Sequence, residues 1–247
     1  MTTVLKLGGS VLTEKDRAET VDGPALNRAA DAVAAAVGDP PDLVLVHGAG
    51  SFGHYEAEKH GVSVTAGTHD AGAAMDIHGS MKTLNRFVLD SLHERGVPAL
   101  PVHPFSAGAR DADANLTLPT EQVATMLGEG FVPVLHGDLV AHATKGATVI
   151  SGDEVIVELG TALDAERVGL CSTVPGVLRD GEVIPRIESF DEVADVLGGS
   201  DATDVTGGMT GKVEQLLDLD APASIFELDD LDRFLSGGSP GTTIEGT

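Results

Sequence analysis

The sequence contains few of the residues on which several protein classes depend. Its 247 residues include only 15 lysines and arginines, one cysteine and no tryptophan, and 3% are aromatic. So few cations cannot cover an extended phosphate backbone, which argues against a nucleic-acid-binding protein. The single cysteine, Cys171, cannot form an internal disulfide, as is usual in a reducing compartment. The core must therefore be built from alanine, valine, leucine and isoleucine.

Long apolar segments are also absent. No run of 18 apolar residues occurs, and the chain does not open with a basic segment followed by an apolar one. Hydrophobic residues make up 42% of the chain, which is too many for a disordered acidic protein. We therefore expect a globular, cytoplasmic protein without a membrane partner.

Acidic residues are abundant and dispersed along the chain. Asp and Glu number 39, which gives a formal net charge of −24. Such a surface is typical of proteins adapted to molar salt, where a Debye length of about 3 Å screens the self-repulsion. The composition therefore predicts a halophilic protein. Only six lysines remain, and each is worth separate attention: Lys6, Lys15, Lys59, Lys82, Lys145 and Lys212.

Short apolar strands alternate with helical patterns along the chain. Strands are predicted at 4–7, 43–46, 97–102, 132–135, 167–171, 223–226 and 242–244, and hairpins at 139–150 and 177–184. Helices are predicted at 24–37, 70–94, 119–127, 153–163, 191–197, 209–219 and 229–235. This alternation predicts one α/β domain with two lobes and a mostly parallel sheet covered on both faces.

Glycines cluster at three junctions between these elements, at 8–10, 48–53 and 207–212. Glycine lets the backbone approach a phosphate closely, and exposed N–H groups at a helix start favour an anion. None of the junctions matches the GxxxxGK[ST] or GxGxxG pattern. They indicate a phosphate or nucleotide binder, although tight turns in an α/β sheet are an alternative explanation.

Three lysines lie at or beside these glycine turns. Lys6 is in an otherwise apolar strand, where its charge needs an anionic partner. Lys212 follows the last glycine turn, and Lys15 lies in the loop after the first. We expect Lys6 and Lys212 to contact phosphate, whereas Lys15 could equally be a solvated loop residue.

The segments 4–10, 48–54, 150–153 and 204–212 together resemble the amino acid kinase superfamily. More narrowly, they resemble its isopentenyl phosphate kinase family, because a histidine follows Gly53 in the second segment. The resemblance extends over nearly the whole chain.

The resemblance implies a single domain over 1–247 with a three-layer αβα sandwich. An acceptor-binding lobe would span about 1–150 and a nucleotide-binding lobe about 151–247. The implied reaction is direct in-line phosphorylation of isopentenyl phosphate by ATP with Mg²⁺, in archaeal isoprenoid biosynthesis of the mevalonate type. A homodimer is implied as well.

Site residues follow from the same resemblance, motif by motif. The implied catalytic residues are Lys6, Lys15, His54, Asp153 and Lys212. The ATP phosphates would be held by Lys6, Gly8, Gly9, Ser10, Gly50, Gly208 and Lys212. The acceptor phosphate would be held by Ala49, Gly50, His54 and Gly152. Two segments depart from the family pattern: Ala49 replaces a common glycine, and 173–177 replaces the usual adenosine loop.

Further residues are candidates for binding the acceptor. His54 would clamp the acceptor phosphate, and the other eight histidines have no role that their spacing predicts, metal binding included. The helix over 73–92 could wall a prenyl pocket with Met75, Ile77, Met81, Leu84 and Val88, or these residues could belong to the core. Other acceptors remain open: a fosfomycin-like phosphonate, UMP or an acylamino acid. A catalytically silent nucleotide-binding protein is a further alternative.

Overall fold

The main sheet is built from the short apolar strands. The computed structural model describes residues 2–197 and 208–246. In this part of the chain the main sheet has eight strands in the order β12-β14-β13-β9-β1-β2-β6-β3. Their bounds are β1 (Thr3–Leu7), β2 (Leu43–His47), β3 (Ala99–Pro101), β6 (Val132–His136), β9 (Arg167–Ser172), β12 (Arg186–Ile187), β13 (Ala223–Glu227) and β14 (Thr242–Ile244). β14 pairs antiparallel with β13, and all other neighbouring strands, including β12 and β14, pair in parallel. The predicted mainly parallel sheet is confirmed.

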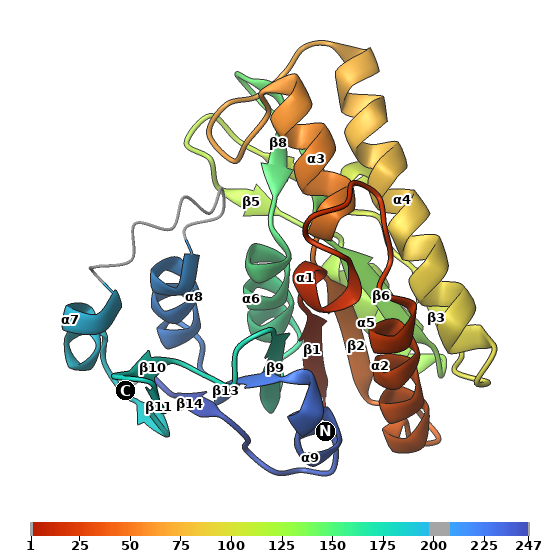
Figure 1. The fold of residues 1–247 in the computed structure, drawn as a ribbon. Helices are drawn as coiled ribbons and strands as arrows, with labels where there is room; N and C mark the ends of the chain where they lie inside the picture. Colours follow the sequence, from red (N-terminus) through yellow and green to blue (C-terminus); the bar gives the residue numbers. More distant parts are fainter. Residues whose placement is uncertain (1, 198–207, 247) are drawn as a thin grey trace.

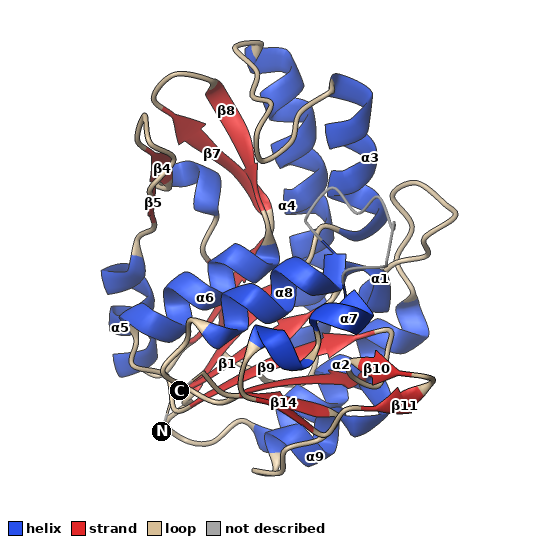
Figure 2. Ribbon diagram, turned by 90° about the vertical axis from the view of Figure 1, so that its left-hand side faces the viewer, coloured by secondary structure: helices blue, strands red, loops and turns tan. Residues whose placement is uncertain are grey.

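A second sheet lies beyond the carboxyl end of β6. It has the order β5-β4-β7-β8 and contains the predicted hairpin. The strands are β4 (Ala109–Arg110), β5 (Leu116–Thr117), β7 (Asp138–His142) and β8 (Gly146–Ile150), and a separate hairpin is formed by β10 (Leu178–Arg179) and β11 (Glu182–Val183). In Figure 2, β7 and β8 extend away from the main sheet beside α3 and α4.

Helices cover both faces of the main sheet. They are α1 (Gly9–Leu12), α2 (Gly23–Ala36), α3 (Gly50–His60), α4 (Ala71–His93), α5 (Thr120–Gly128), α6 (Gly152–Ala162), α7 (Ala194–Leu197), α8 (Gly208–Leu217) and α9 (Leu231–Leu235). Short 3₁₀ turns lie at Pro104–Ser106, Phe190–Glu192 and Leu228–Asp230. One apolar core joins the sheet to α5, α6 and α8, and another joins it to α2, α4 and α9. Figures 1 and 2 show these helices on opposite sides of the strands. None of the described helices is both long and apolar enough to cross a membrane.

The side chains of β1 point alternately to the two faces of the main sheet. Val4 belongs to the core under α5, α6 and α8, whereas Leu5 and Leu7 belong to the core under α2, α4 and α9. Successive side chains on a strand point to opposite faces, so Lys6 shares the face of Val4. The lysine is therefore directed toward α6 and not toward α2.

Two of the described helices were not predicted from the sequence, the four-residue α1 and the longer α3. We expected a glycine-rich turn after β2, but the chain enters α3 at Gly50 and stays helical to His60. Gly53 has a packing role there, because a Cβ at this position would lie 2.5 Å from Sδ of Met81 on α4. Gly53, one of the glycines that suggested a turn, instead allows α3 and α4 to approach closely.

Candidate functional site

Several strands end at one edge of the main sheet, and helices begin there. β1 and β2 of the main sheet run into α1 and α3, which start at Gly9 and Gly50, and β8 of the second sheet runs into α6, which starts at Gly152. Ligands of open α/β sheets bind at this edge, where the first N–H groups of the helices have no partner within the helix. A cavity of about 580 Å³ lies at this edge.

Two of the glycine turns pack directly on each other. A Cβ at Gly9 would lie 2.1 Å from the backbone N of Gly50, and a Cβ at Gly48 would lie 2.5 Å from the N of Gly9. Neither position can therefore carry a side chain without moving backbone. These glycines allow the start of α1 to pack against the start of α3, and Gly9 and Gly48 line the cavity.

Lys6 and Lys212 meet at one carboxylate. Nζ of Lys6 donates to Oδ1 of Asp153 at 2.7 Å, and Nζ of Lys212 lies 3.8 Å from Oδ2. Lys6 comes from β1, Asp153 from the first turn of α6 and Lys212 from α8. The side chains of Lys6 and Asp153 are only 9% and 10% exposed. The structure thus brings together three residues that the sequence placed in separate motifs.

The charge of Asp153 is set by this arrangement. Burial alone would raise the pKa of its carboxyl group, but the nearby ammonium groups of Lys6 and Lys212 outweigh burial and lower it. Asp153 is therefore ionised at neutral pH. Its single negative charge holds two positive charges in the cavity wall, which leaves the cluster with a net positive charge toward a bound anion.

The start of α6 is held rigidly. Oγ of Ser151 accepts from the N–H of Glu154 at 3.0 Å, and a carboxylate oxygen of Glu154 accepts from the N–H of Ser151 at 2.9 Å. This capping box fixes the first turn. The other carboxylate oxygen of Glu154 accepts from Arg110 at 2.5 Å. Asp153 consequently projects from a helix start that is anchored on both sides.

Most of the remaining predicted residues line the same cavity. Its lining includes Gly8, Gly9, Ser10, Lys15, Ala49, His54 and Gly152, in addition to the lysine–aspartate cluster. Gly50 lines an adjoining cavity of about 350 Å³, which also has Ser10, Lys15 and His54 in its wall. Gly208 begins α8, four residues before Lys212. The glycine turn expected at 207 lies outside the described residues.

His54 has a different setting from the one expected. It lies in α3 and not in a loop, and its side chain is exposed at the cavity wall. Lys15 is likewise exposed, in the segment between α1 and α2. Both residues are therefore accessible from solvent, in contrast to Lys6.

The far end of the cavity is apolar. Ala57 of α3 and Ile77 and Met81 of α4 line it, together with Val149 of β8. Of the five predicted pocket residues on α4, Leu84 and Val88 are instead buried in the core, and Met75 is 53% exposed. The cavity therefore has a cationic centre and one apolar end.

The other end of the cavity lies along β9 and β13. Leu170, Cys171, Ser172 and Thr173 line it, with Ile225 of β13. Burial raises the pKa of the Cys171 thiol to about 12, so the thiol is neutral. Thr173 is the first residue of the segment that departs from the family's adenosine loop, and it does reach the cavity.

A buried histidine network was missed from the sequence. His47 and His136 end the neighbouring strands β2 and β6, and their rings stack with centroids 5.2 Å apart. Each Nδ1 donates to the carbonyl of the following glycine, at 3.0 Å to Gly48 and 2.8 Å to Gly137. Both glycines line the cavity. The repeated His-Gly pair at two strand ends was the available signal.

The network continues to a buried carboxylate. Nδ1 of His103 donates to Nε2 of His136 at 2.8 Å, and Nδ1 of His78 donates to Asp138 at 2.9 Å. Asp138 lines the cavity next to Gly137. Burial lowers the pKa of His47 to about 4 and that of His136 to about 3. These two rings are therefore neutral and support the cavity floor by hydrogen bonds.

Known proteins are similar to this chain in fold and in sequence. Residues 1–219 match the amino acid kinase family. The chain is 60% identical over 244 residues to the isopentenyl phosphate kinase of Haloferax volcanii, with 98% of each chain covered. It is 30% identical to the isopentenyl phosphate kinase of Methanocaldococcus jannaschii, with 99% of each chain covered. An X-ray structure of an isopentenyl phosphate kinase matches it with a TM-score of 0.84 at 30% identity, covering 99% of this chain and 100% of the other. The chain therefore belongs to the amino acid kinase family, and within that family it groups with the isopentenyl phosphate kinases.

Proposed function

We propose that this protein transfers the terminal phosphoryl group of ATP to isopentenyl phosphate, forming isopentenyl diphosphate and ADP. The observation that carries the proposal is the cavity: cations gather at its centre and apolar side chains line one end. A phosphorylated prenyl group needs both kinds of surface. The relatives that match nearly the full length of the chain bear the corresponding name.

The nucleotide would lie toward β9, with its phosphates on the cationic centre. Lys6 and Lys212 would contact the phosphate oxygens, and the N–H groups of Gly9 and Ser10 would add hydrogen bonds. Asp153 would not touch the phosphates. It would hold the two ammonium groups in position for them.

The acceptor would lie toward α3 and α4. His54 would contact its phosphate, and Ile77 and Met81 would contact its apolar chain. Lys15 would help to stabilise the transferring phosphoryl group. Because the acceptor phosphate is already an anion, no base has to remove a proton before it attacks the terminal phosphorus. Catalysis then consists of bringing several negative charges into line and compensating them.

Magnesium would enter with the nucleotide. Of the carboxylates in the cavity wall, Asp153 faces Lys6 and Lys212, and Asp138 faces His78. These residues fit Mg²⁺ held mainly by ATP phosphates and water, which is a common arrangement for this ion. When bound, the ion compensates charge on the phosphates. Lys6 and Lys212 would compensate the negative charge on the phosphate oxygens that the ion does not bind.

The test is ADP release in molar KCl with Mg²⁺, measured with isopentenyl phosphate and with other acceptors. Dimethylallyl phosphate tests the length and shape of the apolar end, and fosfomycin, UMP and acetylglutamate represent the alternative acceptors. We expect the prenyl phosphates to be used best. Efficient turnover of another acceptor without turnover of either prenyl phosphate would refute the proposal.

The expected homodimer is a separate prediction. Light scattering in molar KCl would give the molecular mass directly. A mass equal to that of one chain would contradict it.

A further inference from the structure

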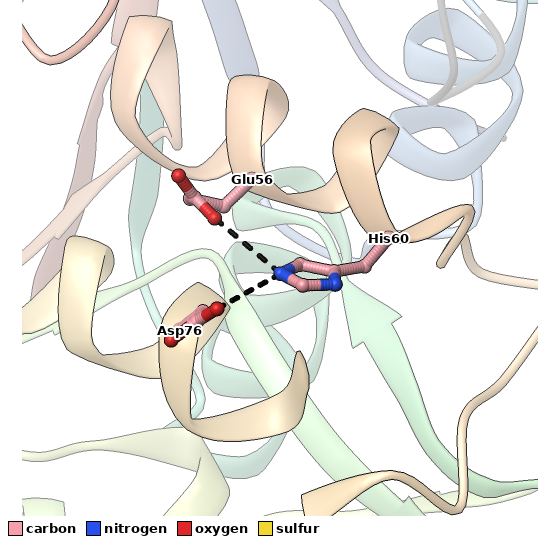
Figure 3. A group of neighbouring side chains, drawn as sticks. All are labelled: Glu56, His60 and Asp76. Carbon is pink, nitrogen blue, oxygen red and sulfur yellow. Dashed lines mark hydrogen bonds and ion pairs between the residues drawn. The ribbon is translucent and has the colours of Figure 1, made fainter. Parts of the chain in front are cut away.

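Three potential metal ligands converge between α3 and α4 (Figure 3). Glu56 and His60 lie one turn apart on α3, and Asp76 lies on α4. Among the described residues their ligand atoms form a group in which all lie within 4.8 Å of one another. Figure 3 shows the imidazole of His60 directed between the two carboxylates.

The distances fit a bound ion. Nε2 of His60 lies 3.0 Å from Oδ2 of Asp76 and 3.5 Å from Oε2 of Glu56. Ligand atoms in a tetrahedral site with bonds of about 2.1 Å lie about 3.4 Å apart. Nε2 can carry only one proton, so it can donate to only one of these two oxygens. A cation placed between the three atoms would satisfy all of them.

The charge and chemistry of the donors select a class of ion. Two carboxylates and a neutral imidazole carry two negative charges, which match a divalent cation. One nitrogen and two oxygens suit Zn²⁺ and its neighbours Co²⁺, Ni²⁺ and Cu²⁺, whereas Mg²⁺ and Ca²⁺ prefer oxygen alone. We propose that Glu56, His60 and Asp76 form a binding site for a divalent transition-metal ion, with Zn²⁺ as its representative.

Lys59 currently compensates part of this negative charge. Its Nζ lies 2.8 Å from Oε2 of Glu56, the same oxygen that faces His60. The lysine side chain is 50% exposed, whereas that of Glu56 is 11% exposed. The ammonium group of Lys59 is at the exposed end of this pair, so an entering ion would displace it into solvent.

The position of the site gives it a structural consequence. The residues that follow two of the ligands, Ala57 on α3 and Ile77 on α4, line the apolar end of the cavity. An ion bound by both helices would therefore link the two helices that line that end. Its binding should stabilise the folded protein by mass action, whatever the acceptor is.

The test is a titration of the chelator-treated protein with Zn²⁺ in molar KCl, followed by calorimetry and by thermal unfolding. We expect about one ion per chain and a rise in Tm of roughly 5 °C or more at a hundredfold excess over Kd. Co²⁺ in place of Zn²⁺ should produce visible absorption bands that Zn²⁺ then removes. Excess Mg²⁺ should not compete.

The variants His60→Ala and Asp76→Asn should each weaken Zn²⁺ binding at least about tenfold. His69→Ala is the matched control, because this exposed histidine lies outside the group and should leave binding unchanged. Absence of binding, or equal binding by the wild type and both ligand variants, would overturn the proposal. Neither result would bear on the kinase reaction, which is measured separately.

Discussion

Asp153 compensates two ammonium groups at once, so the loss of its charge should affect both stability and catalysis. In Asp153→Asn, Lys6 and Lys212 would face each other across a largely buried site without a counter-ion. We expect the free energy of unfolding to fall by about 3 kcal/mol. We expect kcat/KM to fall about a hundredfold or more, because the lysines would no longer be held in place.

Asp164→Asn is the matched control for this measurement. Asp164 is exposed just beyond the end of α6 and has a φ of 48°, a conformation that asparagine tolerates. The Asp164→Asn variant should retain its stability in denaturant unfolding and its activity in steady-state assays. Near-normal kinetics of Asp153→Asn would contradict the role proposed for its carboxylate.

His54 should act on the acceptor and not on the nucleotide. Its side chain lines the cavity from α3, whereas the nucleotide would lie toward β9. In His54→Ala we expect the KM for the acceptor phosphate to rise about tenfold or more, because a charge-assisted hydrogen bond is lost. The affinity for ATP, measured by calorimetry, should change little. An equal loss for both substrates would show that His54 does not act as an acceptor clamp.

At the scale of elements, most predictions are confirmed. The apolar strands, the long helix α4 and the hairpin of β7 and β8 lie where periodicity and turn residues placed them. The predicted strand at 97–102 is shorter, since β3 spans only Ala99–Pro101. The helix predicted at 191–197 forms only in part, as a 3₁₀ turn followed by α7. α3 was missed because glycine is unfavourable in helices. Gly53 is explained by the packing of α3 against α4, and Gly50 has a φ of 51° at the start of the helix.

The contact between the starts of α1 and α3 should be intolerant of side chains. In Gly9→Ala, the new Cβ would meet the backbone of Gly50, which cannot give way as a flexible side chain would. We expect loss of activity and a free energy of unfolding lower by about 3 kcal/mol, as in an overpacked site.

Gly79→Ala is the control for Gly9→Ala. Gly79 lies within α4, and a Cβ there would meet nothing within 4 Å. Its replacement should raise the free energy of unfolding by up to about 1 kcal/mol, because alanine favours the helix. Equal effects of the two substitutions in denaturant unfolding would contradict the packing argument.

At the scale of the whole molecule, the buried histidines should make the protein sensitive to acid. His47 and His136 have pKa values of about 4 and about 3 in the folded state, because burial disfavours the charged rings. In the unfolded chain they titrate near 6.5. Between these values the unfolded chain binds more protons, so stability is lost as the pH falls. The loss should be about 1.4 kcal/mol per pH unit for each histidine.

Urea unfolding in molar KCl at several pH values between about 6.5 and 4 measures this slope. His136→Asn removes one of these groups and should reduce the slope by about 1.4 kcal/mol per pH unit, whatever its stability at neutral pH. His69→Asn changes an exposed histidine and should leave the slope as it is. An unchanged slope in His136→Asn would contradict this origin of the acid sensitivity.

Local chemistry by itself determined much about this protein. The scarcity of lysine made Lys6, Lys15 and Lys212 conspicuous, the glycine turns marked the edge of the sheet where the cavity lies, and the alternation of strands and helices predicted the layers. These inferences need only neighbouring residues, because strand periodicity, helix propensity and turn geometry act over a few positions.

Only the tertiary structure decided which distant residues meet. Lys6 and Asp153 are 147 positions apart, and they pair because β1 lies in the centre of the sheet with α6 on one face. The stacking of His47 on His136 depends on the pairing of β2 with β6, and the meeting of His60 with Asp76 depends on the packing of α3 against α4. Strand order and helix packing minimise the free energy of the whole chain, so no short segment of sequence contains them.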